Sequence, residues 1–268
     1  MSLKEMIEQI RKDIDENPMT EEERQQFIVD CYNEEAGDLN QFDGIDCDVC
    51  NNKGWVQFLQ DGYVRTSQCK CATKRKLYQN AKQSNLGEYV NKKIDDYVVS
   101  EKWQEFIKEK MIDYINNHSK DNVWVMACGQ SGSGKTLLGS IIANHLLFKS
   151  EREVVYTTWT DFISRLKRDM MGDKTNLVSV YLENIKKCDV LFLDEVLKKY
   201  NETDLKYLIE IINYRYTNDK KTIITSERVL DELLEVDEAT FSRAVEKTNG
   251  YLFNIPKDKN KNYRLKFI

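Results

Sequence analysis

The chain has 268 residues, 41% of them hydrophobic and 32% charged, which suits one large domain or one with a small appendage. No apolar run approaches the roughly 18 residues of a membrane span, and the first ten residues lack the pattern of a signal peptide. We therefore expect a cytoplasmic protein with no membrane partner, in which the presence of seven cysteines suggests metal binding rather than disulfides.

The net charge of −5 is unevenly distributed. Residues 1–46 carry 4 basic and 14 acidic side chains, whereas residues 47–93 carry 9 basic and 3 acidic ones. The acidic segment argues against a nucleic-acid surface there. It fits a surface that docks another protein and, equally, a solvated helical face, so charge alone leaves both interpretations open.

Helical spacing predicts a first helix over residues 3–14, which ends at Asn17-Pro18. Thr20 and Glu23 form a capping box that opens a second helix. Residues 38–46 are polar and loop-like, and a short basic helix is expected over residues 74–86. Its run Lys74-Arg75-Lys76 could contact a phosphate backbone, although such a run is usually a solvated face.

Between these segments lies a cluster of four cysteines with the spacing of a zinc ribbon: Cys47, Cys50, Cys69 and Cys71. Two close thiolate pairs separated by a hairpin-length insert match tetrahedral Zn²⁺ binding of the closed, structural kind. The insert contains an Asp61-Gly62 turn, as a hairpin would. The second pair is C-x-C rather than the usual C-x-x-C, so unrelated free cysteines remain the alternative. Cys128 is expected to pack in a strand.

From residue 123 onward, strands alternate with helices, which predicts an α/β fold with a mainly parallel sheet buried on both faces. An amphipathic helix is expected before it, over residues 101–116. The expected strands are 123–127, 153–158, 189–193, 221–225 and 251–255, with a possible last one at 263–267. The expected helices are 136–149, 160–170, 176–186, 203–216 and 238–248.

A complete phosphate-binding loop follows the first of these strands. It comprises Gly129, Gln130, Ser131, Gly132, Ser133, Gly134, Lys135 and Thr136. The glycines let backbone N–H groups point at phosphate oxygens, and the following helix adds its dipole. Lys135 would reach the β- and γ-phosphates and Thr136 would take a Mg²⁺ position. A strand before the loop and a helix after it favour a nucleoside triphosphate site over a chance glycine-rich turn.

Further candidate residues lie at the ends of later elements. Asp194 would hold Mg²⁺ and Glu195 would polarise the attacking water, because both follow a buried strand. Thr225, Ser226 and Glu227 end the next strand and could sense the γ-phosphate, or could be ordinary turn residues. Arg243 could reach the nucleotide of a neighbouring subunit, or be a lone surface arginine.

With these motifs in order, residues 45–268 resemble the DnaC/DnaI-type helicase loaders, which are AAA+ ATPases, in their phage and mobile-element form. The resemblance rests on the cysteine ribbon and on six later segments: Gly129–Thr136, Leu193–Glu195, Ile211–Tyr216, Ile223–Glu227, Ala239–Arg243 and Asn262–Lys266. The sensor segment departs from the family pattern, in which asparagine often follows Thr-Ser, because Glu227 stands there.

The resemblance implies an AAA+ core without a C-terminal helical lid, together with ATP and Mg²⁺. It further implies a head-to-tail homo-oligomer (a hexamer or an open spiral), Arg243 as the trans-acting finger, a DnaB-type replicative helicase as partner and single-stranded DNA binding. We divide the chain into an N-terminal helical and zinc-ribbon domain at 1–93, which would dock the helicase, and an ATPase domain at 94–268.

Two other functions compete with a loader. A transposition-helper ATPase of the related IstB type would act on duplex DNA and a transposase, but the cysteine ribbon and acidic segment argue against it. A non-enzymatic adaptor would use the nucleotide only as a switch. The intact Lys135, Thr136, Asp194 and Glu195 argue against that.

Overall fold

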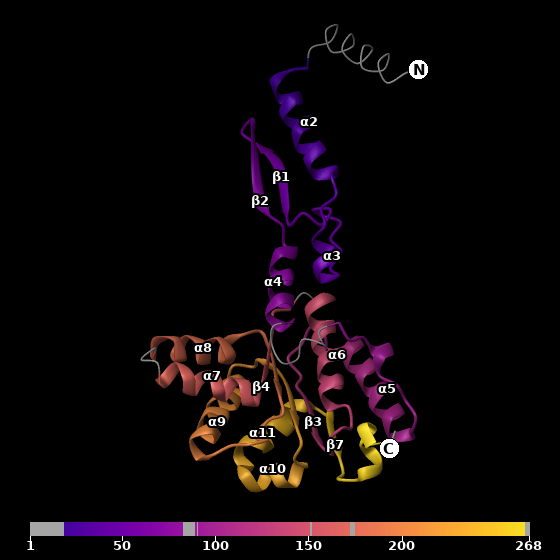
Figure 1. The fold of residues 1–268 in the computed structure, drawn as a ribbon, viewed down its shortest axis with the longest axis vertical. Coiled ribbons are helices and arrows are strands. Elements are labelled where there is room, and N and C mark those ends of the chain that lie inside the picture. The colour runs from indigo at the N-terminus through magenta and orange to yellow at the C-terminus, as the bar shows by residue number, and fades with distance from the viewer. Residues whose placement is uncertain (1–18, 83–88, 90, 151, 172–174, 266–268) are drawn as a thin grey trace. The chain divides into compact units, whose positions relative to one another are not determined.

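The computed structural model describes residues 19–82, 89, 91–150, 152–171 and 175–265. The helix expected over residues 3–14 lies outside these ranges. The chain packs as two units, Met1–Lys76 and Leu77–Ile268, labelled by element in Figure 1. Within the described residues no helix combines the length and the apolar character that crossing a membrane would demand.

The N-terminal unit is a hairpin flanked by helices. Its elements are α2 (Glu21–Glu34), α3 (Leu39–Asp43), β1 (Trp55–Gln60), β2 (Tyr63–Gln68) and the start of α4 (Cys71–Lys82). The capping box of Thr20 and Glu23 is confirmed. Gln60 pairs with Tyr63, so the expected Asp61-Gly62 turn connects the strands directly. A short helix, α3, occupies part of the segment expected to be a loop.

One asparagine fastens α2 to the hairpin. The Asn33 amide donates to the carbonyl of Gln57 at 2.8 Å and accepts from the Gln57 backbone N–H at 3.0 Å. These two hydrogen bonds have the donor and acceptor pattern with which a neighbouring strand would pair with β1. These hydrogen bonds attach α2 to the hairpin, and the side chains of Phe27 and Ile28 on this helix are exposed.

The second unit contains a five-stranded sheet in the order β4-β5-β6-β3-β7, with every neighbouring pair parallel. The strands are β3 (Val125–Gly129), β4 (Val154–Thr158), β5 (Val190–Asp194), β6 (Lys221–Ser226) and β7 (Leu252–Ile255). All residues of β3, β5 and β6 are buried, which confirms the prediction of a parallel sheet covered on both faces. Cys128 is fully buried in β3, as expected.

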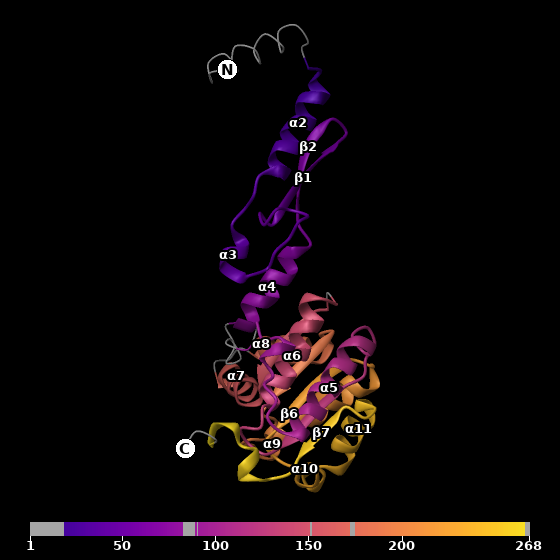
Figure 2. The same cartoon turned by 90° about the vertical axis from the view of Figure 1, so that its right-hand side faces the viewer.

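Helices cover both faces of this sheet (Figures 1 and 2). They are α5 (Lys102–Asn117), α6 (Lys135–Phe148), α7 (Trp159–Met171), α8 (Thr175–Lys187), α9 (Glu202–Thr217), α10 (Leu230–Val236) and α11 (Glu238–Thr248). On one face α6 packs closely, with Gly139 against the ring of Phe192. On the other face α7, α9 and α11 bury a cluster that includes Trp159, Ile211 and Phe241. The sequence interpretation missed α10.

Two features differ from the sequence expectation. Tyr263–Leu265 forms a short 3-10 helix, η4, rather than a strand, because the Tyr263 N–H bonds to the carbonyl of Gly132 and turns the chain over the phosphate loop. The two compact units meet after Lys76, whereas we drew the domain boundary after residue 93. The intervening segment contacts the second unit, since Asn144 donates to the carbonyls of Tyr89 and Lys92 at 2.9 Å.

Candidate functional site

The phosphate loop runs from the end of β3 into the start of α6. Gly129, Gly132 and Gly134 all have positive φ. At Gly129, with φ of 106°, a Cβ atom would lie 1.8 Å from the carbonyl oxygen of Ile255, so no side chain fits beside β7. The Gln130 N–H donates to that same oxygen at 3.0 Å. The loop is therefore shaped by its contact with the neighbouring strand as well as by its own turns.

Lys135 is 7% exposed and bonds back to the loop. Its Nζ donates to the carbonyls of Gly129 at 2.9 Å and Gln130 at 2.5 Å. Burial lowers the pKa of this ammonium, and the nearby carboxylate of Glu227 acts in the opposite direction. The positive charge is thus already positioned where the loop would receive phosphate.

Asp194 ends β5 and meets two hydroxyl groups. Thr136 Oγ1 lies 3.1 Å and 3.0 Å from its two carboxylate oxygens, and Thr225 Oγ1 donates to Oδ1. The aspartate is 2% exposed, and burial raises its pKa while both hydroxyl groups counteract that shift. A hydroxyl and a carboxylate in contact supply the oxygen ligands that Mg²⁺ prefers, so this pair fits the ion.

Glu195 adopts a left-handed backbone, with φ of 55°, immediately after the strand. Its N–H donates to Thr225 Oγ1 at 3.0 Å, and the next N–H, of Val196, donates to the Thr225 carbonyl at 2.8 Å. Glu195 lines the pocket described below, and Lys198, which is outside the pocket lining, forms an ion pair with it at 2.8 Å.

The three candidates at the end of β6 have separate contacts. Thr225 bonds to Asp194, and Ser226 Oγ donates to the carbonyl of Val196 at 2.8 Å. Glu227 forms a hydrogen bond with the phosphate loop, where its Oε1 accepts from Ser131 Oγ at 2.8 Å. The residue that departs from the family pattern is therefore the one that touches the loop.

A cavity of about 240 Å³ opens beside the phosphate loop, within the second unit. It is lined by Lys135, Thr136, Glu195 and the three residues at the end of β6. It also contains residues that we did not select from the sequence: Tyr89, Asp96, Tyr97, Val98, Gln104, Tyr263 and Arg264. These come from segments before β3 and after β7, and of them only Tyr263 and Arg264 belong to a segment that supported the resemblance, Asn262–Lys266.

Arg243, on α11, is not among the described residues that line this cavity. Its Nη1 donates to Asn213 Oδ1 of α9 at 2.7 Å, and its guanidinium lies 6.0 Å from the ring centre of Tyr216. Both partners belong to the segment Ile211–Tyr216 that supported the resemblance. Within one protomer the arginine is therefore held by α9 and not by the nucleotide pocket.

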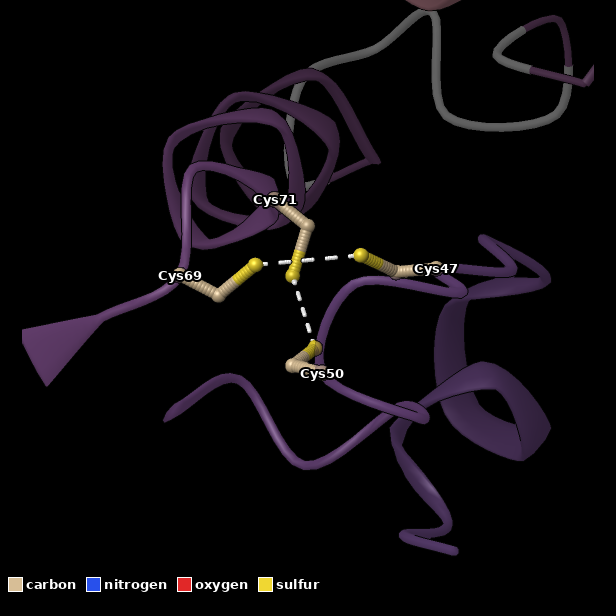
Figure 3. Close-up of side chains that lie close together, drawn as sticks. All are labelled: Cys47, Cys50, Cys69 and Cys71. Atoms are coloured by element: carbon tan, nitrogen blue, oxygen red, sulfur yellow. Dashed lines mark hydrogen bonds between the residues drawn. The ribbon is translucent and has the colours of Figure 1, made fainter. Parts of the chain in front are cut away.

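The four clustered cysteines converge in the N-terminal unit (Figure 3). All four sulfur atoms lie within 4.8 Å of one another, with Cys47 to Cys69 at 3.7 Å and Cys50 to Cys71 at 3.5 Å. Four thiolates around Zn²⁺ at about 2.3 Å would be about 3.8 Å apart, which is close to these two separations, so the cluster fits the ion after small side-chain shifts.

Backbone and side-chain contacts surround this cluster. The Gly54 N–H donates to Cys50 Sγ at 3.3 Å. Arg75 is buried, and its Nη1 donates to both carboxylate oxygens of Asp43, at 2.5 and 2.6 Å. We had considered two roles for this arginine, contact with a phosphate backbone and exposure on a solvated helical face. Because Arg75 is buried, both interpretations are wrong for it. It ties α4 to α3 beside the metal ligands.

The carboxyl ends of the parallel strands bring three groups together: the phosphate loop at β3, the carboxylates of Asp194 and Glu195 at β5, and the polar side chains at the end of β6. This arrangement defines an AAA+ P-loop core. The chain belongs to the family of the bacterial DnaA ATPase domain, whose model matches residues 95–247, more than half of the sequence. Helicase loaders of the DnaC type are among the proteins to which the chain is similar.

Three relatives illustrate this placement. The phage-like element PBSX protein XkdC of Bacillus subtilis (strain 168) is 29% identical over 77% of this chain and 81% of its own length. The replicative helicase loader DnaC of Buchnera aphidicola subsp. Baizongia pistaciae is 23% identical over 54% of this chain and 64% of its own length. The crystal structure of the DnaC helicase loader, 23% identical, matches with a TM-score of 0.51 over 64% of this chain and 99% of that one. The chain spans about half the length of the DnaA structures that it matches.

Proposed function

We propose that this protein is a Mg²⁺-dependent ATPase. The observation that carries the proposal is the contact between Thr136 and Asp194 beside the buried ammonium of Lys135. Lys135 would bind the β- and γ-phosphates, and the backbone of residues 129–134 would surround them. Thr136 and Asp194 would hold Mg²⁺, which when bound supplies charge to neutralise the phosphate oxygens.

Glu195 is the proposed general base, which orients and polarises the attacking water. Its carboxylate is paired with Lys198 in the protomer, so hydrolysis requires that this ion pair loosen. Thr225 would position both acidic residues through its hydroxyl group. Glu227 would sense the γ-phosphate indirectly, because its bond to Ser131 lies on the loop that receives the phosphate.

Arg243 is proposed to complete the site of the next subunit in a homo-oligomer, as a hexamer or an open spiral. Its position outside the cavity of its own protomer supports this role. Asn213 would then set the direction of the guanidinium. An arginine supplied in this way stabilises charge that develops on the transferred phosphoryl group.

The assembly is proposed to load a DnaB-type replicative helicase onto single-stranded DNA at the initiation of replication. The names of the DnaC relatives support this proposal. The N-terminal region, residues 1–93, would dock the helicase. Its helix α2 exposes Phe27 and Ile28 at 59% and 50% among acidic residues, which suits a partner surface with apolar and basic groups. Zn²⁺ at the four cysteines would fix that fold.

A loading assay tests the proposal. Purified protein is mixed with a DnaB-type helicase from the same cell, ATP and circular single-stranded DNA, and helicase bound to DNA is measured after gel filtration. We expect loading to require this protein and to fail with Lys135→Ala. Absence of any helicase binding would refute the loader function, and preferential assembly on duplex DNA would favour the IstB-type alternative.

A further inference from the structure

The second cysteine pair of the cluster, Cys69-x-Cys71, is one residue shorter than the usual spacing, and its sulfur atoms differ in their hydrogen-bond donors. In the first pair, the Gly54 N–H donates to Cys50 Sγ at 3.3 Å. The Cys71 N–H lies within hydrogen-bonding reach of the Cys69 sulfur. Cys71 itself begins α4, and no backbone N–H of the described residues donates to its sulfur. The buried sulfur of Cys71 therefore needs a donor from a side chain.

Arg75 is in position to be that donor. It stands four residues after Cys71, one turn further along the same face of α4. Its guanidinium lies within hydrogen-bonding reach of the Cys71 sulfur. The Arg75 side chain is buried, and its Nε forms no hydrogen bond with a nitrogen or oxygen atom of the residues that the structure describes. A cationic donor without an oxygen partner thus lies beside a sulfur that becomes a thiolate when it binds zinc.

The other nitrogen atoms of Arg75 fix the guanidinium in place. Nη1 donates to both carboxylate oxygens of Asp43, at 2.5 and 2.6 Å. Nη2 donates to the carbonyl of Ile45 at 2.8 Å and to Asn52 Oδ1 at 3.2 Å. The same Asn52 oxygen accepts the backbone N–H of Cys47 at 2.9 Å. One side chain therefore connects the loop of the first cysteine pair with the helix that carries the last cysteine of the second.

We propose that Arg75 donates a hydrogen bond to the Cys71 thiolate of the zinc-loaded cluster and thereby lowers the reactivity of that thiolate toward electrophiles. This inference rests on the proposed zinc site and makes Arg75 a positioning residue for it. Four thiolates carry more negative charge than one Zn²⁺ neutralises, and a cationic donor withdraws electron density from sulfur. Asp43 would orient the guanidinium as a carboxylate orients a metal-binding histidine. A side chain one helical turn away thus compensates for the shorter spacing.

The absorption of the cobalt-substituted protein tests the hydrogen bond. The full-length chain is prepared with Co²⁺ in place of Zn²⁺, and the sulfur-to-metal charge-transfer band is recorded for wild type, Arg75→Met and Lys76→Met. Loss of a hydrogen bond raises the energy of the sulfur electrons, so we expect the band of Arg75→Met to move to longer wavelength. Lys76 is exposed on the same helix, and Lys76→Met should match wild type.

The rate of zinc release tests the reactivity. N-ethylmaleimide is added to the zinc-loaded proteins, and a chromogenic chelator reports the released metal. We expect release from Arg75→Met to be on the order of tenfold faster than from wild type, the effect of one charge-assisted hydrogen bond. A lower midpoint of thermal unfolding in Arg75→Met, with an unchanged band and an unchanged release rate, would mean that Arg75 only ties α4 to α3 and would overturn the proposal.

If Arg75→Met holds no metal, Arg75→Lys is measured in its place, because it keeps the positive charge. An ammonium group cannot reach Asp43 and Cys71 together as the guanidinium does, so we expect a shifted band and a release rate above that of wild type. Wild-type behaviour of Arg75→Lys would overturn the proposal. A wild-type protein that binds neither metal is a distinct result, which would remove the zinc site itself.

Discussion

The hydroxyl group of Thr136 lies within 3.1 Å of both carboxylate oxygens of Asp194, 58 residues further along the chain. The contact joins the first turn of α6 to the end of β5. Both groups are oxygen ligands, and Asp194 is almost fully buried. A buried carboxylate bonded to two hydroxyl groups and no cationic side chain is ready to accept a cation, because burial disfavours its charge until a counter-charge arrives.

Lys135→Ala should abolish tight nucleotide binding, because it removes the ammonium that the loop carbonyls hold at the phosphate position. We expect at least a tenfold loss of ATP affinity, the effect of a charged hydrogen bond. Lys149→Ala, at the exposed far end of the same helix, is the control. Isothermal titration measures both. Unchanged affinity in Lys135→Ala would contradict the phosphate-loop assignment.

Glu195→Gln should bind ATP normally and hydrolyse it roughly a hundredfold more slowly, because the amide cannot accept a proton from water. Steady-state phosphate release and analogue binding, measured on the same preparation, separate the two effects. Glu235→Gln changes an exposed glutamate outside the cavity and should behave as wild type. Equal turnover by Glu195→Gln and wild type would support the adaptor interpretation.

Arg243→Ala and Lys135→Ala should complement each other if the arginine acts in trans. Each variant alone is expected to be nearly inactive as an ATPase. In a mixture, a Lys135→Ala subunit still offers Arg243 to a neighbour that binds ATP, so activity should exceed the sum of the two separate preparations. A mixture with no more than additive activity would place Arg243 outside the catalytic site of its neighbour.

Metal analysis should find about one Zn²⁺ per chain in protein purified without chelators. Cys50→Ser should lose the metal and lower the midpoint of thermal unfolding, because structural zinc contributes directly to folding. Cys31→Ser is the matched control, since Cys31 is exposed in the same unit and outside the cluster. The site would be disproved by metal-free wild-type protein, or by equal zinc content in the two variants.

The buried ammonium group of Lys221 should make the stability of the folded protein depend on pH. It is fully buried against the hydroxyl group of Tyr114, at 2.8 Å, and burial lowers its pKa from 10.5 to about 8, with Arg152 adding to the shift and Asp121 opposing it. Between these values the unfolded chain binds the proton that the folded chain has lost, so stability rises with pH. Between pH 8 and 10.5 the free energy of unfolding of the wild type should therefore increase by up to about 3 kcal/mol relative to that of Lys221→Met. Urea unfolding across this range measures it, and parallel curves would contradict the shift.

The order of motifs along the chain was sufficient to predict the class of fold and the central site. Alternation of apolar strands with helices predicts a parallel sheet, and the carboxyl ends of its strands share one edge. The phosphate loop, Asp194 and Glu195 could therefore be brought together from the sequence. The four cysteines could be grouped for a similar reason, because their spacing is local and the hairpin between them is short.

Other parts depended on contacts that no local pattern records. In the sequence Arg75 belongs to a basic run and was expected to be exposed or to contact phosphate, yet its side chain is buried against Asp43, 32 residues away. Residues 263–265 read as a strand, but the N–H of Tyr263 pairs with the carbonyl of Gly132 and not with a strand neighbour. A sequence pattern reports which face of an element is apolar, whereas a single hydrogen bond between distant segments leaves no periodic trace.

The sequence by itself thus determined a P-loop core with a four-cysteine cluster, because glycine-rich turns, buried strands and metal-ligand spacings are local properties. Only the tertiary structure decided which polar residues face the nucleotide pocket from outside these motifs. It placed Arg264 in the lining of the cavity and Arg243 outside it, and it brought the Glu227 carboxylate into a hydrogen bond with the phosphate loop. Those positions follow from how the strands pack side by side, which brings together residues more than a hundred positions apart in the chain.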